Sequence, residues 1–387
     1  MIDDHTLLIP SYNRPALLQR LVRHYSDRAR PMTLLVLDSS TPDIVDQNAK
    51  TLSAYGSLRH VPFPTTISMA TKLARGIELV ETPYVSICAD DDLVFPDGLR
   101  EATAFMRQQP DYVSAHGLYL NFRLAGNDLH LTREYAGPGN DAQDPGARIF
   151  RLLQRYESLF YGVFRTSDLQ DIFSAVPTLP TLHYQELFQS VAALIKGKVH
   201  RFPRLYAARQ SCEPAEPTRD KWQTYYWFAD DPAEILEHYR TYRSAVWTFY
   251  ESRVALPRLG RAAFFRVLDL AHAVYFSAQC PPAYFHSVLE AYWPEDRYVD
   301  LEKGDMFEQL HGRTAASRWP PERLLGAARH VLRAAWSAPA VARLDRDVRK
   351  AYRTPWRCRL PVRLRWLAGN AEFRGTYFEL CHYLDAD

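Results

Sequence analysis

The sequence predicts an α/β protein with a mostly parallel sheet in its amino-terminal half, followed by a mostly helical carboxy-terminal region. Up to about residue 204, short apolar runs alternate with helical patterns, and beyond about Pro217 no strand alternation continues. Strands that alternate with helices form βαβ units, in which the strands run parallel. We therefore expect two domains, residues 1–216 and residues 217–387.

The first domain is predicted element by element from hydrophobic periodicity. Strands are expected over residues 6–9, 32–37, 58–61, 84–88, 158–165 and 199–202. Helices are expected over residues 15–28, 43–55, 69–80, 96–107, 167–173 and 183–196. Between residues 121 and 146, Gly, Pro, Asn and Asp accumulate, which predicts a long loop or irregular excursion.

The amino-acid composition favours a globular protein and disfavours several other classes of protein. With 387 residues, 47% hydrophobic and 24% charged, the chain is typical of a globular protein. A net charge of +2 argues against a dedicated nucleic-acid binder. The five cysteines form no CxxC pair, which disfavours a zinc site or a disulfide framework. No signal segment or membrane-spanning run is evident, so we expect a cytoplasmic protein.

Three consecutive carboxylates, Asp90, Asp91 and Asp92, directly follow a predicted buried strand. Neighbouring carboxylates repel one another, and a hard divalent cation such as Mg²⁺ or Mn²⁺ relieves that repulsion while it binds substrate phosphate. The alternative is an acidic turn or a helix cap.

Two other predicted strand ends carry suitable groups. The first is followed by Pro10-Ser11-Tyr12-Asn13-Arg14-Pro15, where Tyr12 offers a surface for a base and Arg14 a partner for phosphate. The second ends at Asp38, which offers an acceptor for a base N–H or a ribose hydroxyl. Alternatively, Tyr12 packs in the core and Asp38 caps a helix. Open α/β sheets bind ligands at the carboxyl ends of their strands, so we expect these loops to lie together.

In this order, the motif of residues 9–15, Leu37-Asp38-Ser39-Ser40 and Ala89-Asp90-Asp91-Asp92 resembles the family 2 glycosyltransferases, which have a GT-A type, Rossmann-like fold. The resemblance extends over about residues 6–204, and no G-x-G-x-x-G supports a dinucleotide site instead. It implies that Asp90 bonds the ribose and that Asp91 or Asp92 holds Mn²⁺ or Mg²⁺ on the diphosphate. It also places four further residues in the nucleotide pocket: Pro10, Ser11, Tyr12 and Asp38.

The family places a catalytic base at the start of a helix that leads through a Gly turn into a strand. His183-Tyr184-Gln185-Glu186-Leu187 followed by Gly197 reproduces that layout, so Glu186 is the candidate base, although Leu187 replaces the second acid of the family's pair. A surface glutamate is the alternative.

Four more residues are candidates at this site. The resemblance makes Arg209 a phosphate ligand in a segment that closes over the diphosphate. Tyr161 or Arg165 lines the donor-sugar site or is structural. Lys72 is a phosphate or base contact, or a solvated helix residue, and the solvated position is the more common one for such a lysine.

The implied function is transfer of a sugar from a nucleoside-diphosphate sugar, in the first place a UDP-sugar, to a hydroxyl of a carbohydrate or lipid-linked acceptor. Inversion follows if Glu186 is the base, and the setting is bacterial polysaccharide or glycolipid assembly. The alternatives are a nucleotidyltransferase and a non-catalytic binding or scaffold protein.

The carboxy-terminal region carries many basic residues with two interleaved tryptophans: Arg343, Arg346, Arg349, Lys350, Arg353, Arg357, Arg359, Arg363, Arg365, Trp356 and Trp366. Such residues favour a membrane interface, and a peripheral contact with anionic lipid is one interpretation. A solvated face, with Asp345 and Asp347 diluting the charge, or an oligomer contact is the other.

Overall fold

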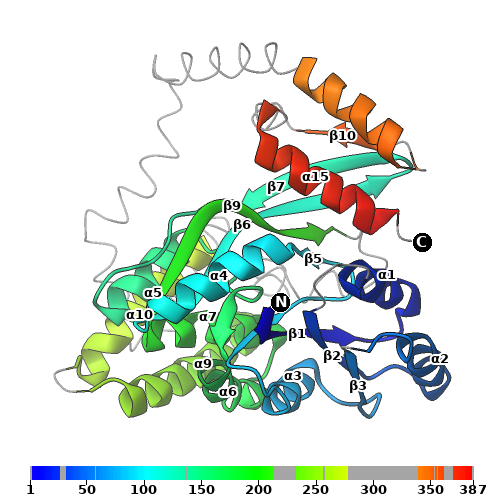
Figure 1. Ribbon diagram of the computed structural model, residues 1–387. Helices are drawn as coiled ribbons and strands as arrows, with labels where there is room; N and C mark the ends of the chain where they lie inside the picture. Colours follow the sequence, from blue (N-terminus) through cyan, green and yellow to red (C-terminus); the bar gives the residue numbers. More distant parts are fainter. Residues whose placement is uncertain are drawn as a thin grey trace, which may run out of the picture.

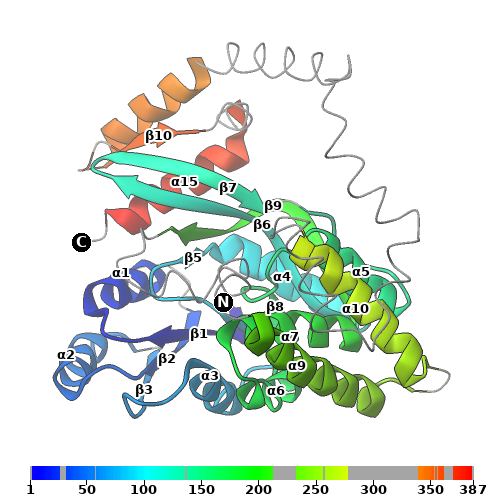
Figure 2. The same cartoon turned by 180° about the vertical axis from the view of Figure 1, so that it is seen from behind.

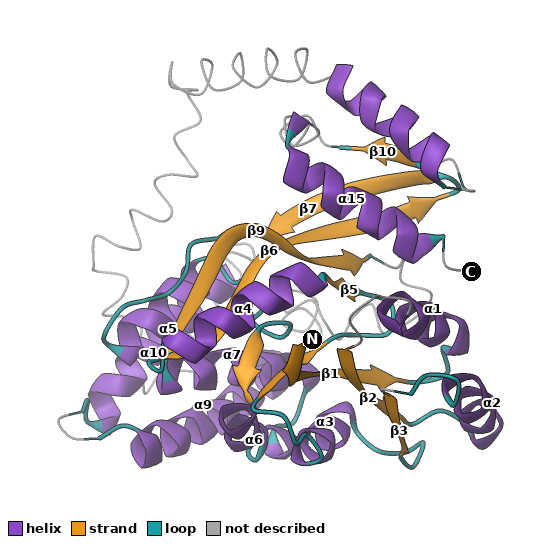
Figure 3. Ribbon diagram, in the orientation of Figure 1, coloured by secondary structure: helices purple, strands orange, loops and turns teal. Residues whose placement is uncertain are grey.

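The computed structural model describes residues 2–26, 32–56, 58–135, 137–211, 232–255, 258–277, 339–352, 354, 356–360 and 369–385. These residues form a curved, mixed sheet with helices on both faces and further helices from the carboxy-terminal region (Figures 1 and 3). The GT-A type architecture expected from the sequence is confirmed.

The amino-terminal part is the predicted parallel sheet. Its strands are β1 (Ile2–Ser11), β2 (Met32–Asp38), β3 (Leu58–Pro62) and β4 (Tyr84–Ile87), in the order β3-β2-β1-β4. The helices between and after them are α1 (Pro15–Ser26), α2 (Pro42–Leu52), α3 (Met69–Glu78) and α4 (Pro96–Gln108). Ser11 pairs with Asp38, and Leu8 pairs with Ile87, so the loops after β1, β2 and β4 leave the same edge.

Side-chain alternation along the strands builds a hydrophobic core on each face of the sheet. Leu8 packs on one face with side chains of α3, whereas Leu7 and Ile9 pack on the other face with side chains of α1 and α4. Full burial of such a side chain contributes roughly 1.5–3 kcal/mol. The strand ends, and the loops that carry the acidic triplet, are therefore held on a rigid support.

The prediction of a long loop over residues 121–146 is wrong for most of that range. Residues 112–135 form a hairpin of β6 (Tyr112–Ala125) and β7 (Asp128–Tyr135), and α5 (Pro145–Gln154) follows. Polar Asn121 and Arg123 alternate with buried Leu120 and Phe122, a period-2 pattern that the neighbouring turn residues obscure. The strands turn at Gly126, whose φ of 55° suits a residue without a side chain.

Two predicted strands have other lengths. The strand expected over residues 158–165 is reduced to β8 (Val163–Arg165), and the strand expected over residues 199–202 extends to β9 (Lys198–Gln210). Pro203 suggested an early end, but the pairing of β9 with β6 is irregular between Arg201 and Leu205, and a bulge tolerates proline there. Beyond it, Ala207 and Ala208 pair with β6 on one side and with β5 (Leu93–Val94) on the other.

Between β8 and β9 the chain forms α6 (Thr166–Phe173), the short 3₁₀ helix η1 (Val176–Thr178) and α7 (Leu182–Lys196). From the carboxy-terminal region, α9 (Pro232–Arg253) packs on α7, and α10 (Arg261–Ser277) packs on α5 (Figure 2). Thus α7 lies between the sheet and the first described helices of that region.

The last part of the chain packs on the other face. A helix over residues 339–351, β10 (Arg357–Arg359) and α15 (Ala371–Leu384) contribute Leu344, Cys358 and Tyr377 to the core that holds Leu7. β10 pairs with β7, a strand that the sequence did not predict in a mostly helical region.

Several expectations lie outside the described residues: the domain boundary at 216/217, Arg353, Arg363, Arg365 and Trp366. Within the described ranges, no helix combines the length and the apolar character needed to cross a bilayer.

Candidate active site

The acidic triplet turns the chain from β4 into β5 and contacts the loop after β1. The Ser11 hydroxyl donates to Asp90 Oδ2 at 2.8 Å, and one Arg14 nitrogen donates to Asp90 Oδ1 at 3.2 Å and to Asp91 Oδ2 at 2.8 Å. These contacts follow from the parallel register of β1 and β4. The structure therefore brings Ser11, Arg14, Asp90 and Asp91 together as the sequence predicted.

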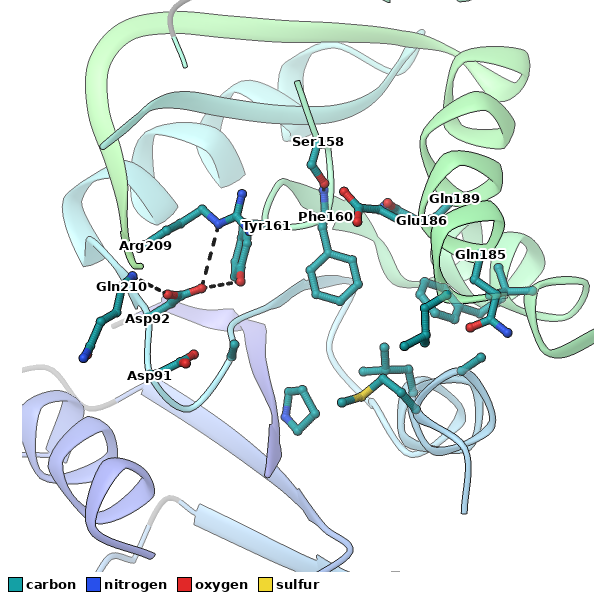
Figure 4. Close-up of a pocket in the computed structure, with 18 residues that line it drawn as sticks. Asp91, Asp92, Ser158, Phe160, Tyr161, Gln185, Glu186, Gln189, Arg209 and Gln210 are labelled. Atoms are coloured by element: carbon teal, nitrogen blue, oxygen red, sulfur yellow. Dashed lines mark hydrogen bonds and ion pairs between the residues drawn. The ribbon is translucent and has the colours of Figure 1, made fainter. Parts of the chain in front are cut away.

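Asp92 is buried, like Asp90, with 5% of its surface exposed. The Tyr161 hydroxyl donates to Oδ2, the Gln210 backbone N–H donates to Oδ1 at 2.7 Å, and Arg209 Nε lies 4.0 Å from Oδ2 (Figure 4). Burial, together with the neighbouring charge of Asp91, raises the pKa of Asp92 to about 7. The pairing of β9 with β5 explains how residues 209 and 210 reach this carboxylate.

The loops after β1 and β2 are joined by Asn13. Its backbone N–H donates to Ser40 Oγ at 2.8 Å, and its side-chain oxygen accepts from the Thr41 N–H at 2.9 Å. Asn13 has a φ of 54°, in the left-handed region that Asn tolerates better than most residues. The conformation presents Tyr12 to solvent, with 49% of its surface exposed, so Tyr12 is not a core residue.

Lys72 is not the solvated helix residue that the sequence favoured, since only 1% of its surface is exposed. Its ammonium donates to the Ser11 carbonyl at 2.9 Å and to Ser39 Oγ at 2.8 Å, which ties the ends of β1 and β2 together. Burial lowers the pKa of Lys72 to about 8, although the charges of Asp90 and Asp38 oppose that shift.

Asp38 lies at the end of β2 and is fully buried. Its carboxylate accepts hydrogen bonds from the Ser40 N–H at 2.9 Å, Asn48 Nδ2 at 2.8 Å and His60 Nε2 at 3.0 Å. Burial alone would raise the pKa of Asp38, but the bonds from His60, Asn48 and Ser40 outweigh it and hold the pKa below its usual range. Its place in a nucleotide pocket stays a prediction.

A cavity of about 420 Å³ opens beside the acidic loop. One end of the cavity is lined by Asp91, Asp92, Arg209 and Gln210. The opposite wall is formed by three residues of α7, Gln185, Glu186 and Gln189 (Figure 4). The rest of the lining is mostly apolar and consists of Pro10, Met69, Ala70, Leu73, Ala89, Phe160, Phe173, Val176 and Leu182, together with Ser158 and Tyr161. The cavity thus joins a charged end, a polar wall and an apolar wall.

Glu186 is held on the first turns of α7. The helix begins after Thr181, whose hydroxyl accepts from the Tyr184 N–H at 3.3 Å, and Tyr156 donates its hydroxyl hydrogen to Glu186 Oε1 at 3.2 Å. The next residue, Leu187, is buried in the core, which explains why an acid is absent there. Glu186 is half-buried and lines the cavity, a position that suits a base facing a substrate.

Residues 6–166 match the model of the family described as glycosyl transferase family 2. This segment is a family 2 glycosyltransferase domain. The protein is accordingly a glycosyltransferase, which sets aside the nucleotidyltransferase and the non-catalytic protein as alternatives. Asp90, Asp91 and Asp92 lie inside the matched segment of the glycosyltransferase, whereas Glu186 and Arg209 lie beyond it.

No curated protein matches the glycosyltransferase sequence. Similar solved structures include S. aureus TarS 1–349 in complex with UDP-GlcNAc, with 14% identity and a TM-score of 0.49 over 71% of this chain and 73% of that chain. S. aureus TarS itself has 14% identity and a TM-score of 0.45 over 71% and 44%. TarS 1–349 with UDP has 12% identity and a TM-score of 0.44 over 76% and 93%.

Sequence reasoning missed several residues of the glycosyltransferase cavity. Gln185 and Gln189 share a face of α7 with Glu186, and polar residues spaced by three or four in an otherwise apolar helix were the available signal. Tyr161 was one of two candidates for the donor site, and it lines the cavity. The other, Arg165, donates to the carbonyls of Met106 and Gln109 at the end of α4 and is structural.

Proposed function

We propose that this glycosyltransferase transfers a sugar from a nucleoside-diphosphate sugar, in the first place a UDP-sugar, to a hydroxyl of a carbohydrate or lipid-linked acceptor, with inversion and with a bound metal ion. The supporting observation is the cavity itself, with Asp91, Asp92 and Arg209 at one end and Glu186 across from them (Figure 4). A diphosphate suits the first end, and an acceptor hydroxyl suits the second.

The acidic loop suits Mn²⁺ or Mg²⁺ in its donor chemistry. Among the described residues, no group of three or more His, Cys, Asp or Glu side chains could hold a metal alone. Mg²⁺ needs only one or two carboxylates when substrate phosphates complete its shell, and Asp91 and Asp92 provide these. Burial, and after it the charge of Asp91, raises the pKa of Asp92, and a cation beside both carboxylates would favour their charged forms. When bound, such a metal supplies Lewis-acid stabilisation of the leaving diphosphate.

Other residues at this end of the cavity stabilise the leaving diphosphate and position Asp92. Arg209 places a second positive charge beside Asp92, where charge develops on the leaving diphosphate. Tyr161 and the Gln210 N–H hold the Asp92 carboxylate in place. The nucleotide is proposed to bind near five further residues: Tyr12, Arg14, Asp38, Lys72 and Asp90.

Glu186 is the proposed general base. It takes the proton from the acceptor hydroxyl while that oxygen forms its bond to the anomeric carbon. The bond from the anomeric carbon to the diphosphate oxygen breaks, and its electron pair leaves with the diphosphate. A single displacement of this kind inverts the anomeric configuration.

We further propose that residues 1–216 hold the donor on the cytoplasmic side of the membrane, in bacterial polysaccharide or glycolipid synthesis, and that residues 217–387 contact the acceptor, a membrane surface or a second copy. Exposed Arg343, Arg346 and Arg349 on the helix over residues 339–351 support the contact with an anionic partner.

Thermal unfolding with UDP tests the donor end. UDP with Mn²⁺ is expected to raise the melting temperature, because a ligand that binds only the folded state stabilises it, and EDTA is expected to abolish the shift. The double variant Asp91→Ala, Asp92→Ala is expected to lose the shift. Asp43→Ala, Asp46→Ala is a control with the same charge change on the exposed surface of α2. An unchanged shift in the first variant would sink the assignment of this end.

A further inference from the structure

Arg20, on the inner face of α1, is a buried arginine whose hydrogen-bond partners carry no charge. Only 6% of its surface is exposed. Its Nη2 donates to Gln210 Oε1 at 2.9 Å and to the Tyr383 hydroxyl at 2.9 Å, and its Nε has no partner among the described residues. The guanidinium also lies over the Tyr383 ring, 4.4 Å from the ring centroid. Burying a charge without a counter-charge is costly, so a contribution to stability does not by itself explain this arginine.

The two partners of Arg20 belong to distant parts of the chain. Gln210 is the last residue of β9, and its backbone N–H donates to Asp92 Oδ1 at 2.7 Å. Tyr383 lies in the last turn of α15, a helix that packs on both α1 and β9 (Figure 1). Arg20 therefore connects the carboxy-terminal helix to the residue whose N–H holds Asp92.

A second contact joins α1 to the strand that follows Asp92. Tyr25 donates its hydroxyl hydrogen to the Val94 carbonyl at 2.8 Å and accepts from the Val94 N–H at 3.0 Å. Between Arg20 and Tyr25 along the helix, His24 packs edge-on against Tyr383, with ring centroids 5.6 Å apart. The buried face of α1 thus contacts α15 and is bonded to two residues near Asp92.

We infer that Arg20 is a positioning residue of the acidic end, and that α15 supports the acidic loop through it. This step rests on the proposed function, in which Asp91 and Asp92 provide ligands for the metal. Removing a partner that hydrogen-bonds to a metal-ligating group changes metal affinity by about 10- to 100-fold. Arg20 lies one step further out, because it fixes the Gln210 side chain and Gln210 bonds to Asp92, so we expect a smaller effect.

The dependence of UDP binding on Mn²⁺ tests this role. UDP affinity is measured calorimetrically over a series of Mn²⁺ concentrations, and the concentration that gives half of the maximal affinity is compared between proteins. Arg20→Met removes the charge and both hydrogen bonds, and that concentration is expected to rise at least about fivefold. Tyr383→Phe removes only the bond from α15 and should raise it about threefold. At saturating Mn²⁺ both variants should reach the wild-type affinity, because the contacts to UDP itself are unchanged.

A matched control separates positioning from a general loss of structure. Tyr377→Phe makes the same change at another buried tyrosine of α15, whose hydroxyl has no hydrogen-bond partner among the described residues. We expect its Mn²⁺ dependence to equal that of the wild type. A purely structural role of Arg20 and Tyr383 would lower the melting temperature and leave the half-maximal Mn²⁺ concentration unchanged.

The outcomes are distinct. An unchanged half-maximal Mn²⁺ concentration in Arg20→Met and Tyr383→Phe, or an equal rise in Tyr377→Phe, overturns this inference while the proposed function stands. If Arg20→Met does not fold, the comparison of Tyr383→Phe with Tyr377→Phe decides. If the wild type binds no UDP at any Mn²⁺ concentration, the proposed function fails and this inference with it.

Discussion

The two facing walls of the cavity are built in opposite ways. At the acidic end, Asp90 and Asp92 each accept hydrogen bonds from residues far away in the sequence, and Arg14 bridges Asp90 and Asp91. On the α7 wall, within the described residues, Glu186 accepts one hydrogen bond and Gln189 none. The difference teaches that the protein itself holds the charged end in place, whereas the described residues leave polar groups of the α7 wall without hydrogen-bond partners.

Among the predicted substitutions, replacement of the proposed base Glu186 is expected to have the largest effect on activity. Glu186→Gln is expected to lower turnover by about 10²- to 10⁴-fold, because the amide cannot take the acceptor proton. Donor binding at the other wall should be unaffected. Release of UDP from the UDP-sugar gives the rate, and calorimetry with UDP gives the affinity. Glu78→Gln, at an exposed position of α3, is the control, and near-normal turnover in Glu186→Gln would remove its role as base.

Two tyrosines allow the same chemical change on each wall. Tyr161→Phe removes the hydrogen bond to buried Asp92, and a bond to a charged group contributes about 1.5–3 kcal/mol, so kcat/KM should fall at least about tenfold. Tyr156→Phe removes the bond to half-buried Glu186 and should cost about threefold or less, in kcat and not in UDP affinity. Equal effects would break the contrast between the walls.

The smallest effect on activity is expected from a substitution in the helices that pack behind α7, namely α9 and α10. Tyr184 of α7 packs on Tyr242 of α9, and Tyr242 hydrogen-bonds to His272 of α10 at 3.1 Å. Burial lowers the pKa of His272 to about 4. An unfolded chain takes up a proton at histidine below about pH 6.5, while the folded chain does not, so the free energy of unfolding falls as the pH falls from 6.5 towards 4.

His272→Gln is expected to reduce this pH dependence. Between pH 7.5 and 5, His272 alone should cost the wild type about 2 kcal/mol, which urea denaturation at the two pH values measures in both proteins. Equal losses in wild type and variant would contradict a neutral, buried His272. Turnover at pH 7.5 should change little.

The sequence predicted what local periodicity and strand direction determine. Parallel strands end at one edge, so Arg14 could be expected near Asp90, and the structure places it there. The hairpin of β6 and β7 was missed because its polar residues alternate only weakly with apolar ones between turn-forming residues. β10 was missed because three residues are too few to show a period.

Contacts between distant segments were not predictable from local patterns. Tyr161 reaches Asp92 across 69 positions and Gln210 reaches it across 118, so both depend on the path of the chain through β8 and β9. Gln189 is a different case. Its polarity in an apolar stretch of α7 was visible, but its lack of a partner required every neighbouring element to be placed.

The double pairing of β9 has a consequence for how this protein can change over evolution. At Ala207 and Ala208 the strand is bonded on both edges, and Arg209 and Gln210 follow directly. Substitutions along the strand leave that register intact. A single inserted or deleted residue just before it would turn each of these side chains to the opposite face of the sheet. Length variation is therefore more easily accommodated at the turn around Gly126, where residues 125–127 are exposed.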